Sequence, residues 1–311
     1  MRTLVVGAGA TGGFFGGRLA AAGRDVTFLV RPARAAALRE RNLRIVWQGE
    51  EEVIRARLVT APELSGPYDL VLLGIKSSAL EQAMADIAPA IGPETSIMPF
   101  LNGMAHLSTL TERFGPAVLG GVVKVLTALN EEGDVLRFAP LASLTVGDQQ
   151  GGLPPRVERI RAELDGAGFD VAASPDIVGA MWHKWVFIST IGATTCLMRG
   201  TIGEVVAVPG GSALGPAIMA EASAVSAAAG HPMPERESKF TRSMATMENS
   251  PLASSAYRDV VAGRPAEVEQ IFGDLVARAR SLSVPTPLLD LATMQLRVHQ
   301  RRAEGQVQAA G

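Results

Sequence analysis

The stretch that decides the fold is TLVVGAGATGG, residues 3–13. Its first four residues, Thr3 to Val6, form a short and mostly apolar run with the length of a buried strand, and the spacing of small residues predicts a helix from Gly12 to Ala22. The turn between them, Gly7-Ala8-Gly9-Ala10-Thr11-Gly12, has the spacing G-x-G-x-x-G. Between a strand and a helix, this spacing is typical of a turn that binds the pyrophosphate of a dinucleotide.

Each glycine of this turn has its own physical role. Gly7 permits the tight bend, Gly9 lets the backbone approach the pyrophosphate, and Gly12 lets the helix pack closely against the strand. The first N–H groups of the helix have no partner within it, so they face the anion. We therefore expect the cofactor to contact the whole turn, namely Gly7, Ala8, Gly9, Ala10, Thr11 and Gly12.

The end of the second predicted strand, Val26 to Val30, indicates which dinucleotide is bound. An Asp or Glu about 20 residues after the turn would bond the ribose 2′-hydroxyl and favour NAD. Arg31 stands there instead, and a guanidinium can hold a 2′-phosphate with two parallel hydrogen bonds. We therefore predict NADP(H) as the cofactor, with Arg34 assisting from one helical turn further on.

The first half of the chain alternates short apolar runs with helical stretches, a pattern typical of a parallel sheet with crossover helices. Lys76 and Asn102 each follow a predicted strand, at the carboxyl edge where ligands bind in such sheets, although a plain surface loop residue is the alternative at both positions. The sequence therefore predicts an α/β, Rossmann-type, NADP-binding domain over residues 1–172. Its further strands are expected at 70–75, 96–99, 118–129, 135–146 and 169–171, its helices at 78–90 and 153–167, and a hairpin turn at 130–134.

The second half changes character, because it shows helical periodicity and almost no strand-like alternation. Most of its predicted helices begin with a proline or an acidic first turn. We expect an all-α domain over residues 173–311 that carries substrate and catalytic groups. Its helices are predicted at 176–198, 216–229, 234–247, 267–281 and 287–301.

Composition limits the classes of function. The formal net charge of -2 over 311 residues makes no case for nucleic acid or an acidic membrane surface as partner. No apolar run of about 18 residues lacks a charge or a helix breaker, so no membrane span is expected. Cys196 is the single cysteine, which fits a reducing cytoplasm. The histidines lack the spacing of metal ligands, and no metal is expected.

Lys184 is the candidate for chemistry in the second half. It lies in Trp182-His183-Lys184-Trp185-Val186-Phe187-Ile188, a strongly apolar stretch of predicted helix, and a lysine is rarely buried unless it is paired or functional. Desolvation lowers the pKa of a lysine, which suits a proton donor working near neutral pH. The alternative is a lysine whose ammonium reaches the surface. His183 points about 100° away from Lys184 on a helix and is expected to be structural.

Taken together, these residues resemble the ketopantoate reductase (2-dehydropantoate 2-reductase) family over essentially the whole chain. The combination and its order are far more specific than any one motif. It comprises the turn from Gly7 to Gly12, Arg31, Lys76, Asn102-Gly103-Met104, the Trp-x-Lys helix at Lys184, Ser254-Ser255, Asp259 and the run Gly263-Arg264-Pro265-Ala266-Glu267.

The resemblance implies NADPH-dependent reduction of a 2-oxo acid to a 2-hydroxy acid. Lys184 matches the family's catalytic lysine, which donates a proton to the carbonyl oxygen and contacts substrate. Glu267 matches a catalytic glutamate that contacts cofactor or substrate, although Glu269 lies only two residues away. Asn102 matches an asparagine near both nicotinamide and substrate, and Ser255 matches a serine that helps to hold the substrate carboxylate.

The chain departs from the family at three asparagines. Ile188, Gly192 and Ile202 stand at those positions, and the first two share a helical face with Lys184. The face that should offer amides to a polar substrate is therefore expected to be apolar, with Thr194 and Thr195 as candidate replacements. Lost hydrogen bonds to a substrate hydroxyl can cost several orders of magnitude in rate, so the reaction type is better supported than the substrate.

Three hypotheses about function follow. The first is reduction of ketopantoate in pantothenate biosynthesis, and the second is NADPH-dependent reduction of another, less polar 2-oxo acid. The third is a non-catalytic NADP(H)-binding sensor, although a sensor need not retain a proton donor. We expect the site to lie between the two domains and the chain to form a homodimer.

Overall fold

The computed structural model describes the backbone of residues 1–310 and the side chains of residues 1–305. The chain divides into two compact units. One comprises Met1–Leu101 and His106–Val178, and the other comprises Asn102–Ala105 and Gly179–Gly311. The division after Val178 falls within a long helix, and the short loop from Asn102 belongs with the second unit although it follows a strand of the first. Each unit is described by itself.

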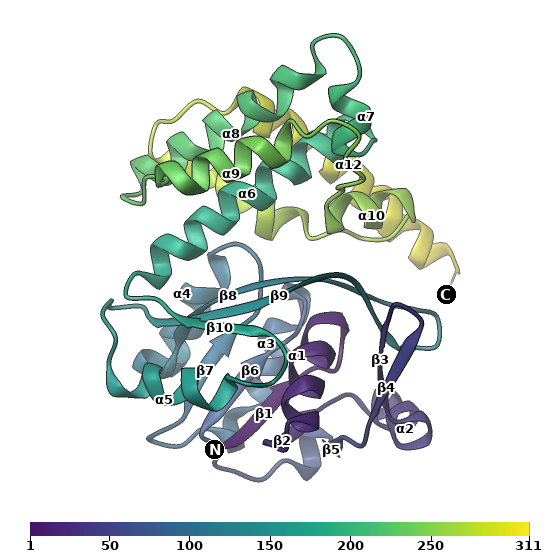
Figure 1. Ribbon diagram of the computed structural model, residues 1–311, viewed down its shortest axis with the longest axis vertical. Coiled ribbons are helices and arrows are strands. Elements are labelled where there is room, and N and C mark those ends of the chain that lie inside the picture. The colour runs from purple at the N-terminus through teal and green to yellow at the C-terminus, as the bar shows by residue number, and fades with distance from the viewer. Residues whose placement is uncertain (311) are drawn as a thin grey trace. The chain divides into compact units, whose positions relative to one another are not determined.

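The first unit is built on a parallel five-stranded sheet in the order β5-β2-β1-β6-β7, seen in the lower part of Figure 1. From β1 the chain moves first to one side of the sheet and later to the other, so the strand order reverses beside β1. Ligands of such sheets bind at the carboxyl ends of the strands next to this reversal. The strands are β1 (Arg2–Val6), β2 (Asp25–Leu29), β5 (Arg57–Val59), β6 (Leu70–Leu73) and β7 (Ser96–Pro99).

Helix α1 (Ala10–Ala21) lies between this sheet and a second one, and glycines make both contacts close. A Cβ on Gly16 would lie 2.8 Å from the ring of Phe28 in β2. A Cβ on Gly17 would lie 2.9 Å from Leu43 in the second sheet. The glycines after the glycine-rich turn therefore let α1 pack against a sheet on each side.

The second sheet contains the predicted hairpin and a hairpin that was not predicted. Strands β8 and β9 are antiparallel, and their connecting turn is closed by a hydrogen bond from the Asp134 N–H to the Asn130 side chain (2.7 Å). Strands β3 and β4 pair through a turn in which Gln48 and Gly49 both have positive φ, as a two-residue hairpin loop requires. The strands are β3 (Leu43–Trp47), β4 (Glu50–Ile54), β8 (Leu119–Leu129), β9 (Val135–Asp148) and β10 (Asp170–Ala173).

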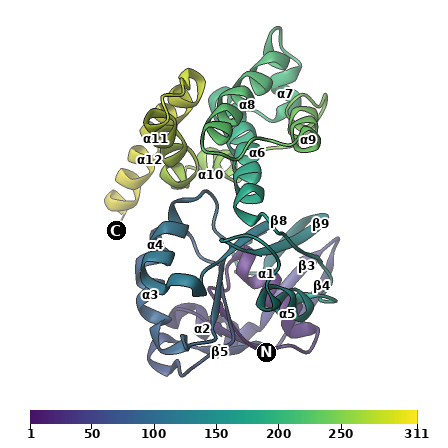
Figure 2. The same ribbon diagram turned by 90° about the vertical axis from the view of Figure 1, so that its left-hand side faces the viewer.

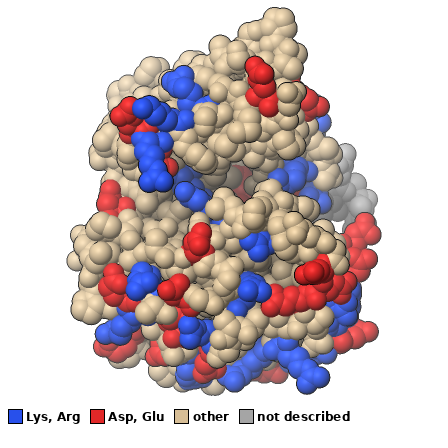
Figure 3. Space-filling model, in the orientation of Figure 1, with Lys and Arg blue, Asp and Glu red and all other residues tan. Residues whose placement is uncertain are grey.

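Helices flank the parallel sheet on both sides, as Figure 2 shows for α3 and α4 on one side and α1 on the other. The face of this unit visible in Figure 3 carries basic and acidic side chains mixed together. The remaining helices of the unit are α2 (Pro32–Arg41), α3 (Leu80–Asp86), α4 (Ala105–Phe114) and α5 (Pro155–Leu164), with short 3-10 turns η1 (Ala61–Glu63), η2 (Ser77–Ala79), η3 (Ala88–Ala90) and η4 (Gly115–Ala117).

The second unit is helical, as predicted. Its first helix, α6 (Ile177–Met198), has buried residues all around its circumference, which is typical of a helix at the centre of a bundle. The start of α12 (Pro287–Ala310) is capped from α8, because the Glu221 carboxylate accepts the N–H groups of Leu288 (3.0 Å) and Leu289 (2.9 Å). The other helices are α7 (Ile202–Val206), α8 (Gly211–Ala228), α9 (Glu235–Ala245), α10 (Ser255–Val261) and α11 (Asp274–Ser281). Among the helices of residues 1–310, none is long and apolar enough to cross a membrane.

The helix predicted at 267–281 is two helices of different type. Glu269–Gly273 forms a π-helical turn, η5, and α11 continues from Asp274. The turn is held from α6, because the buried Trp185 indole donates to the carbonyl of Ile271 (2.8 Å). Single π-helical turns occur frequently at functional sites.

Candidate active site

The glycine turn closes onto the neighbouring strand ends. The Gly7 N–H donates to Leu29 at the end of β2, and the Gly74 N–H donates to Val6 at the end of β1, each over 2.9 Å. Gly7 has a φ of 89°, which favours glycine. A Cβ on Gly12 would lie 2.3 Å from the Gly7 oxygen, and one on Gly74 would lie 2.6 Å from the Gly12 Cα. The turn therefore requires three glycines, of which Gly74 was not predicted.

Gly9 serves a different purpose from these three. The nearest atom to a Cβ on Gly9 would be the Gly74 oxygen, at 4.0 Å, so packing does not require a glycine there. Helix α1 begins directly after Gly9, with no side-chain cap and no acidic residue in its first turn. Open space beside the backbone and uncapped N–H groups are what a pyrophosphate needs. The residues of the turn thus fit a dinucleotide.

Two arginines stand beside this turn with different surroundings. Arg31 is exposed at the start of α2, and its guanidinium makes no hydrogen bond or ion pair with any residue that the structure describes. Arg34 instead donates to the carbonyls of Ala8 (2.9 Å) and Gly133 (2.8 Å). Burial lowers the pKa of Arg34, with Asp134 opposing the shift, yet a guanidinium stays cationic at neutral pH. Arg34 therefore fixes the turn, and Arg31 is the arginine available to a ligand.

The two other residues predicted at the strand ends differ in their setting. Lys76 is exposed and directly precedes the 3-10 turn η2, three residues after β6. Asn102 is half-buried, and its loop packs against η5. A Cβ on Gly103, which has a φ of 75°, would lie 2.1 Å from the Gln270 oxygen. The glycine after Asn102 therefore lets this loop meet the segment that follows Glu267.

Lys184 is half-buried on α6, between two residues with structural roles. His183 contacts the Pro232 carbonyl over 3.1 Å, as expected for a structural histidine. Trp185, together with Trp182, lies under the guanidinium of Arg278, at 5.7 Å from each ring. Because Trp185 also holds η5, the lysine and the glutamate segment are parts of one packed assembly.

The carboxylates of Glu267 and Glu269 can now be distinguished. Glu269 accepts two hydrogen bonds from Arg297, each of 2.7 Å, and this pairing lowers its pKa. Glu267 is half-buried just before η5, and its side chain makes no hydrogen bond or ion pair with the side chains of residues 1–305 or with the described backbone. The preceding loop is fixed by Gln300, whose side chain accepts the Ala266 N–H (2.9 Å). Glu267 is therefore the carboxylate that remains available for a ligand.

The two serines before α10 are also distinguishable. The Ser254 hydroxyl accepts the Tyr257 N–H (3.0 Å) and lies 3.1 Å from the Thr195 hydroxyl of α6. Ser254 is thus a helix cap that ties α10 to α6. Ser255 is exposed, and its hydroxyl has no partner among the described side chains and backbone groups.

The positions at which the family has asparagines are filled by apolar packing. A Cβ on Gly192 would lie 2.7 Å from the ring of Phe272 in η5, so this ring occupies the space of a longer side chain. Ile202 is fully buried in a core cluster with Ile191 and Ala245. Ile188 is half-buried one turn after Lys184.

The idea that two threonines replace the missing amides is wrong. Thr194 donates to the carbonyl of Thr190 and Thr195 to that of Ile191, each over 2.8 Å and within α6. Both side chains are buried. Their hydroxyls serve the helix rather than a ligand.

Sequence reasoning missed Phe272 and the structural role of Trp185. Both lie in apolar stretches and carry no motif, and only their packing across η5 gives them a place in the site. Gly74 could have been found, since a glycine directly after a strand that borders the phosphate turn often marks close backbone approach. In the part of the chain that the structure describes, no three His, Cys, Asp or Glu side chains gather as a metal ion would require.

Known proteins resemble both units. Residues 3–151 match the family Ketopantoate reductase PanE/ApbA, and residues 176–300 match Ketopantoate reductase PanE/ApbA C terminal. An uncharacterized oxidoreductase, YkpB of Bacillus subtilis, is 31% identical over 96% of this chain and 99% of its own.

Solved structures are similar to this chain over nearly its whole length. The PanE/ApbA family ketopantoate reductase from Ralstonia eutropha JMP134 has a TM-score of 0.87 at 25% identity, over 98% of this chain and 100% of its own. A D-mandelate dehydrogenase, solved with NADH and anilino(oxo)acetate, has a TM-score of 0.88 at 21% identity, over 98% of this chain and 100% of its own. At 21% identity, the similarity to D-mandelate dehydrogenase supports the fold alone.

A parallel-sheet unit with a glycine-rich turn that fits a dinucleotide, followed by a helical unit, is the architecture of oxidoreductases that act on a CH–OH group with a nicotinamide dinucleotide, and the family match places this chain in that class. Within that class, the chain belongs to the ketopantoate reductase family.

Proposed function

We propose that this chain reduces a 2-oxo acid to the 2-hydroxy acid with NADPH, and that Lys184 is the proton donor. The first candidate substrate is 2-dehydropantoate (ketopantoate), reduced to pantoate in pantothenate biosynthesis. The observation that carries the proposal is the hydrogen bond from Trp185 to Ile271 (2.8 Å). This bond joins the helix that carries Lys184 to the turn that follows Glu267. The two candidate catalytic groups are therefore held by the same pair of packed elements.

Each residue has a distinct role in the proposed reaction. When bound, the nicotinamide supplies the hydride that reaches the carbonyl carbon. As the carbonyl double bond opens, Lys184 donates a proton to its oxygen and stabilises the developing alkoxide. Asn102 and Glu267 orient substrate and cofactor, and Ser255 helps to hold the substrate carboxylate.

The cofactor groups of the first unit complete the proposal. The backbone of residues 7–12 holds the pyrophosphate, and Lys76 contacts the cofactor from the end of β6. Arg31 selects NADPH, because its guanidinium is exposed and no Asp or Glu follows β2. A cation at this place favours a 2′-phosphate over a 2′-hydroxyl.

A second candidate is a 2-oxo acid with a less polar side chain. The observation that favours it is the ring of Phe272 against Gly192, with Ile188 half-buried on the same side of α6 as Lys184. This face offers no amide to a substrate hydroxyl. A buried hydroxyl without a partner costs about 1–3 kcal/mol, which is a roughly tenfold to hundredfold preference for the substrate that lacks it.

We further propose that the enzyme acts in the cytoplasm as a homodimer. A single cysteine fits a reducing compartment, and a two-fold dimer is the commonest assembly of soluble enzymes.

The experiment is a comparison of NADPH oxidation with two acids that differ by one hydroxyl. They are ketopantoate and 3,3-dimethyl-2-oxobutanoate. Faster turnover of ketopantoate supports the first candidate, and faster turnover of its deoxy analogue supports the second. Tight NADPH binding with no turnover of these or other 2-oxo acids would refute the proposal and favour a sensor.

A further inference from the structure

Helix α12 has an outward apolar face that the proposed reaction does not use. Its inner face is buried in the second unit through Leu289, Ala292 and Leu296. Its outer face carries Leu291, Met294 and Val298, which are 51%, 58% and 46% exposed. Large apolar side chains exposed in a row mark an interaction surface.

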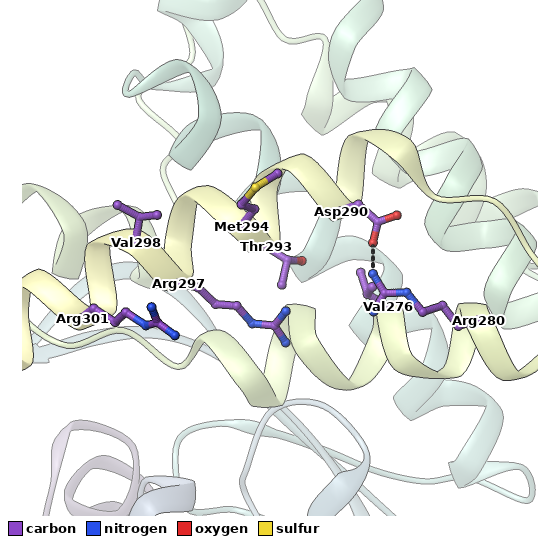
Figure 4. A pocket seen from close by; sticks show the side chains of 8 residues that line it. All are labelled: Val276, Arg280, Asp290, Thr293, Met294, Arg297, Val298 and Arg301. Carbon is purple, nitrogen blue, oxygen red and sulfur yellow. Dashed lines mark hydrogen bonds and ion pairs between the residues drawn. The ribbon is translucent and has the colours of Figure 1, made fainter.

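The spacing of the three side chains is that of a helix-pairing seam. They follow one another at intervals of three and then four residues, which keeps them on one stripe of the helix. Figure 4 shows Met294 and Val298 side by side along α12, with Arg297 and Arg301 on the neighbouring flank. An apolar stripe with this spacing is suited to packing against another helix.

An open cavity of about 400 Å³ adjoins this seam between α11 and α12. Met294, Val298 and Val276 supply its apolar wall, and the charged residues at its edge are Arg280, Asp290, Arg297 and Arg301. A helix laid on the seam can therefore place a side chain in a cavity that has both apolar and charged lining.

The charges along α12 determine the direction of such a helix. Asp290 precedes Leu291, and Arg297 precedes Val298, so the acid and the base flank the seam on the same side, two turns apart. An antiparallel copy of α12 reverses their order and brings Asp290 of one helix to the partner's Arg297, twice by symmetry. A parallel copy would set like charges at the same level.

We propose that the outer face of α12 is the dimer interface, and that it pairs antiparallel with α12 of a second copy of this chain. The ion pairs that each chain already has support this arrangement. Asp290 accepts from Arg280 (2.9 Å), and Arg297 donates to Glu269 (2.7 Å). In the dimer, the Arg280–Asp290 pair of one chain meets the Arg297–Glu269 pair of the other. This contact forms a row of four alternating charges, and it occurs once on each side of the two-fold axis.

The first test measures molar mass by sedimentation velocity on the full-length chain, and it does not depend on turnover. The wild type is expected at twice the 32.6 kDa chain mass. Met294→Glu is expected to shift the population to the monomer, because it places two carboxylates near the axis. Met247→Glu is the matched control, since Met247 is 44% exposed outside α12, and it should remain dimeric. A monomeric wild type, or a Met294→Glu dimer as tight as the wild type, would overturn the proposal.

The second test addresses the antiparallel contact itself. Asp290→Arg sets arginine against arginine in its homodimer, and Arg297→Asp sets aspartate against aspartate. Each variant alone is expected to be largely monomeric. An equimolar mixture is expected to form a heterodimer, because both contacts are then between opposite charges. A mixture that stays as monomeric as its components, with each variant folded by circular dichroism, contradicts the pairing.

Discussion

At the scale of single residues, Arg31 and Arg34 show how similar side chains near one turn take different roles. Arg34 is bound to backbone carbonyls of the turn and of the hairpin, whereas Arg31 is exposed. The sequence predicts that both lie near the cofactor, but only the hydrogen bonds separate the arginine that shapes the turn from the one available to a phosphate.

Arg31→Ala tests cofactor selection. A charge-assisted hydrogen bond is worth about 1.5–3 kcal/mol, so the KM for NADPH is expected to rise about tenfold or more, while the KM for NADH changes little. Arg39→Ala is the control, because Arg39 is an exposed arginine of α2, the helix that Arg31 precedes. Equal increases for both cofactors would refute selection by Arg31.

Gly192 is the second informative residue. In the sequence it stands where the family has an asparagine. In the structure the Phe272 ring packs against it. No sequence pattern reveals this, since the two residues are brought together by the packing of α6 against η5.

Gly192→Ala tests that contact. In a helix this change usually stabilises by about 0.5–1 kcal/mol, but here the Cβ would lie 2.7 Å from the ring, and overpacking costs about 1–3 kcal/mol. We expect a net loss of unfolding free energy in urea. Gly305→Ala, in α12 with nothing within 4 Å of its Cβ, should be neutral or stabilising. A stabilised Gly192→Ala variant would show that the ring is free to move away.

At the scale of elements, the π-helical turn η5 organises the candidate catalytic residues of the second unit. It receives the Gly103 loop, the Trp185 indole and, through Phe272, the Gly192 face of α6. The 3.6-residue periodicity of residues 267–281 predicts a helix correctly, but a single wider turn leaves no mark on such a pattern.

Trp185→Phe tests whether the indole supports η5. The change leaves the buried Ile271 carbonyl without its donor, which costs about 1–3 kcal/mol, and loosening of the turn should also lower kcat/KM. Trp182→Phe is the matched control, because Trp182 is equally buried and stacks on the same arginine, yet its indole N–H makes no hydrogen bond within the described chain. Equal losses of urea stability for the two variants would contradict a special role for the Trp185 donor.

Other elements show what limits prediction from sequence. The hairpin of β8 and β9 was predictable, because its turn is rich in Asn, Glu, Gly and Asp. The hairpin of β3 and β4 was missed for two reasons. Glutamate is uncommon in strands, and β4 begins with Glu50-Glu51-Glu52. Gln48-Gly49 is also a weak turn signal. The short helices α7 and α10 are stabilised by caps at Thr201 and Ser254 rather than by a periodic pattern long enough to detect.

At the scale of the whole molecule, the order of a parallel-sheet unit and a helical unit was predictable, because apolar periodicity changes from short runs to helical spacing along the chain. The assignment of the Asn102 loop to the second unit was not, since it depends on the contact of Gly103 with Gln270. Family membership rests on both units together. In the proposed function, the choice of substrate depends on a few side chains around Lys184, where this chain departs from the family.

The most direct measurement of the central claim is the rate of NADPH oxidation by Lys184→Met with the better of the two 2-oxo acids. Methionine keeps the length of the side chain and removes the proton, and general acid catalysis contributes about 10²–10⁴-fold. We expect kcat to fall at least about a hundredfold while NADPH binding is retained. Lys239→Met, at an exposed lysine of α9, should keep wild-type turnover. Near-normal turnover by Lys184→Met would contradict the assignment of Lys184 as the proton donor.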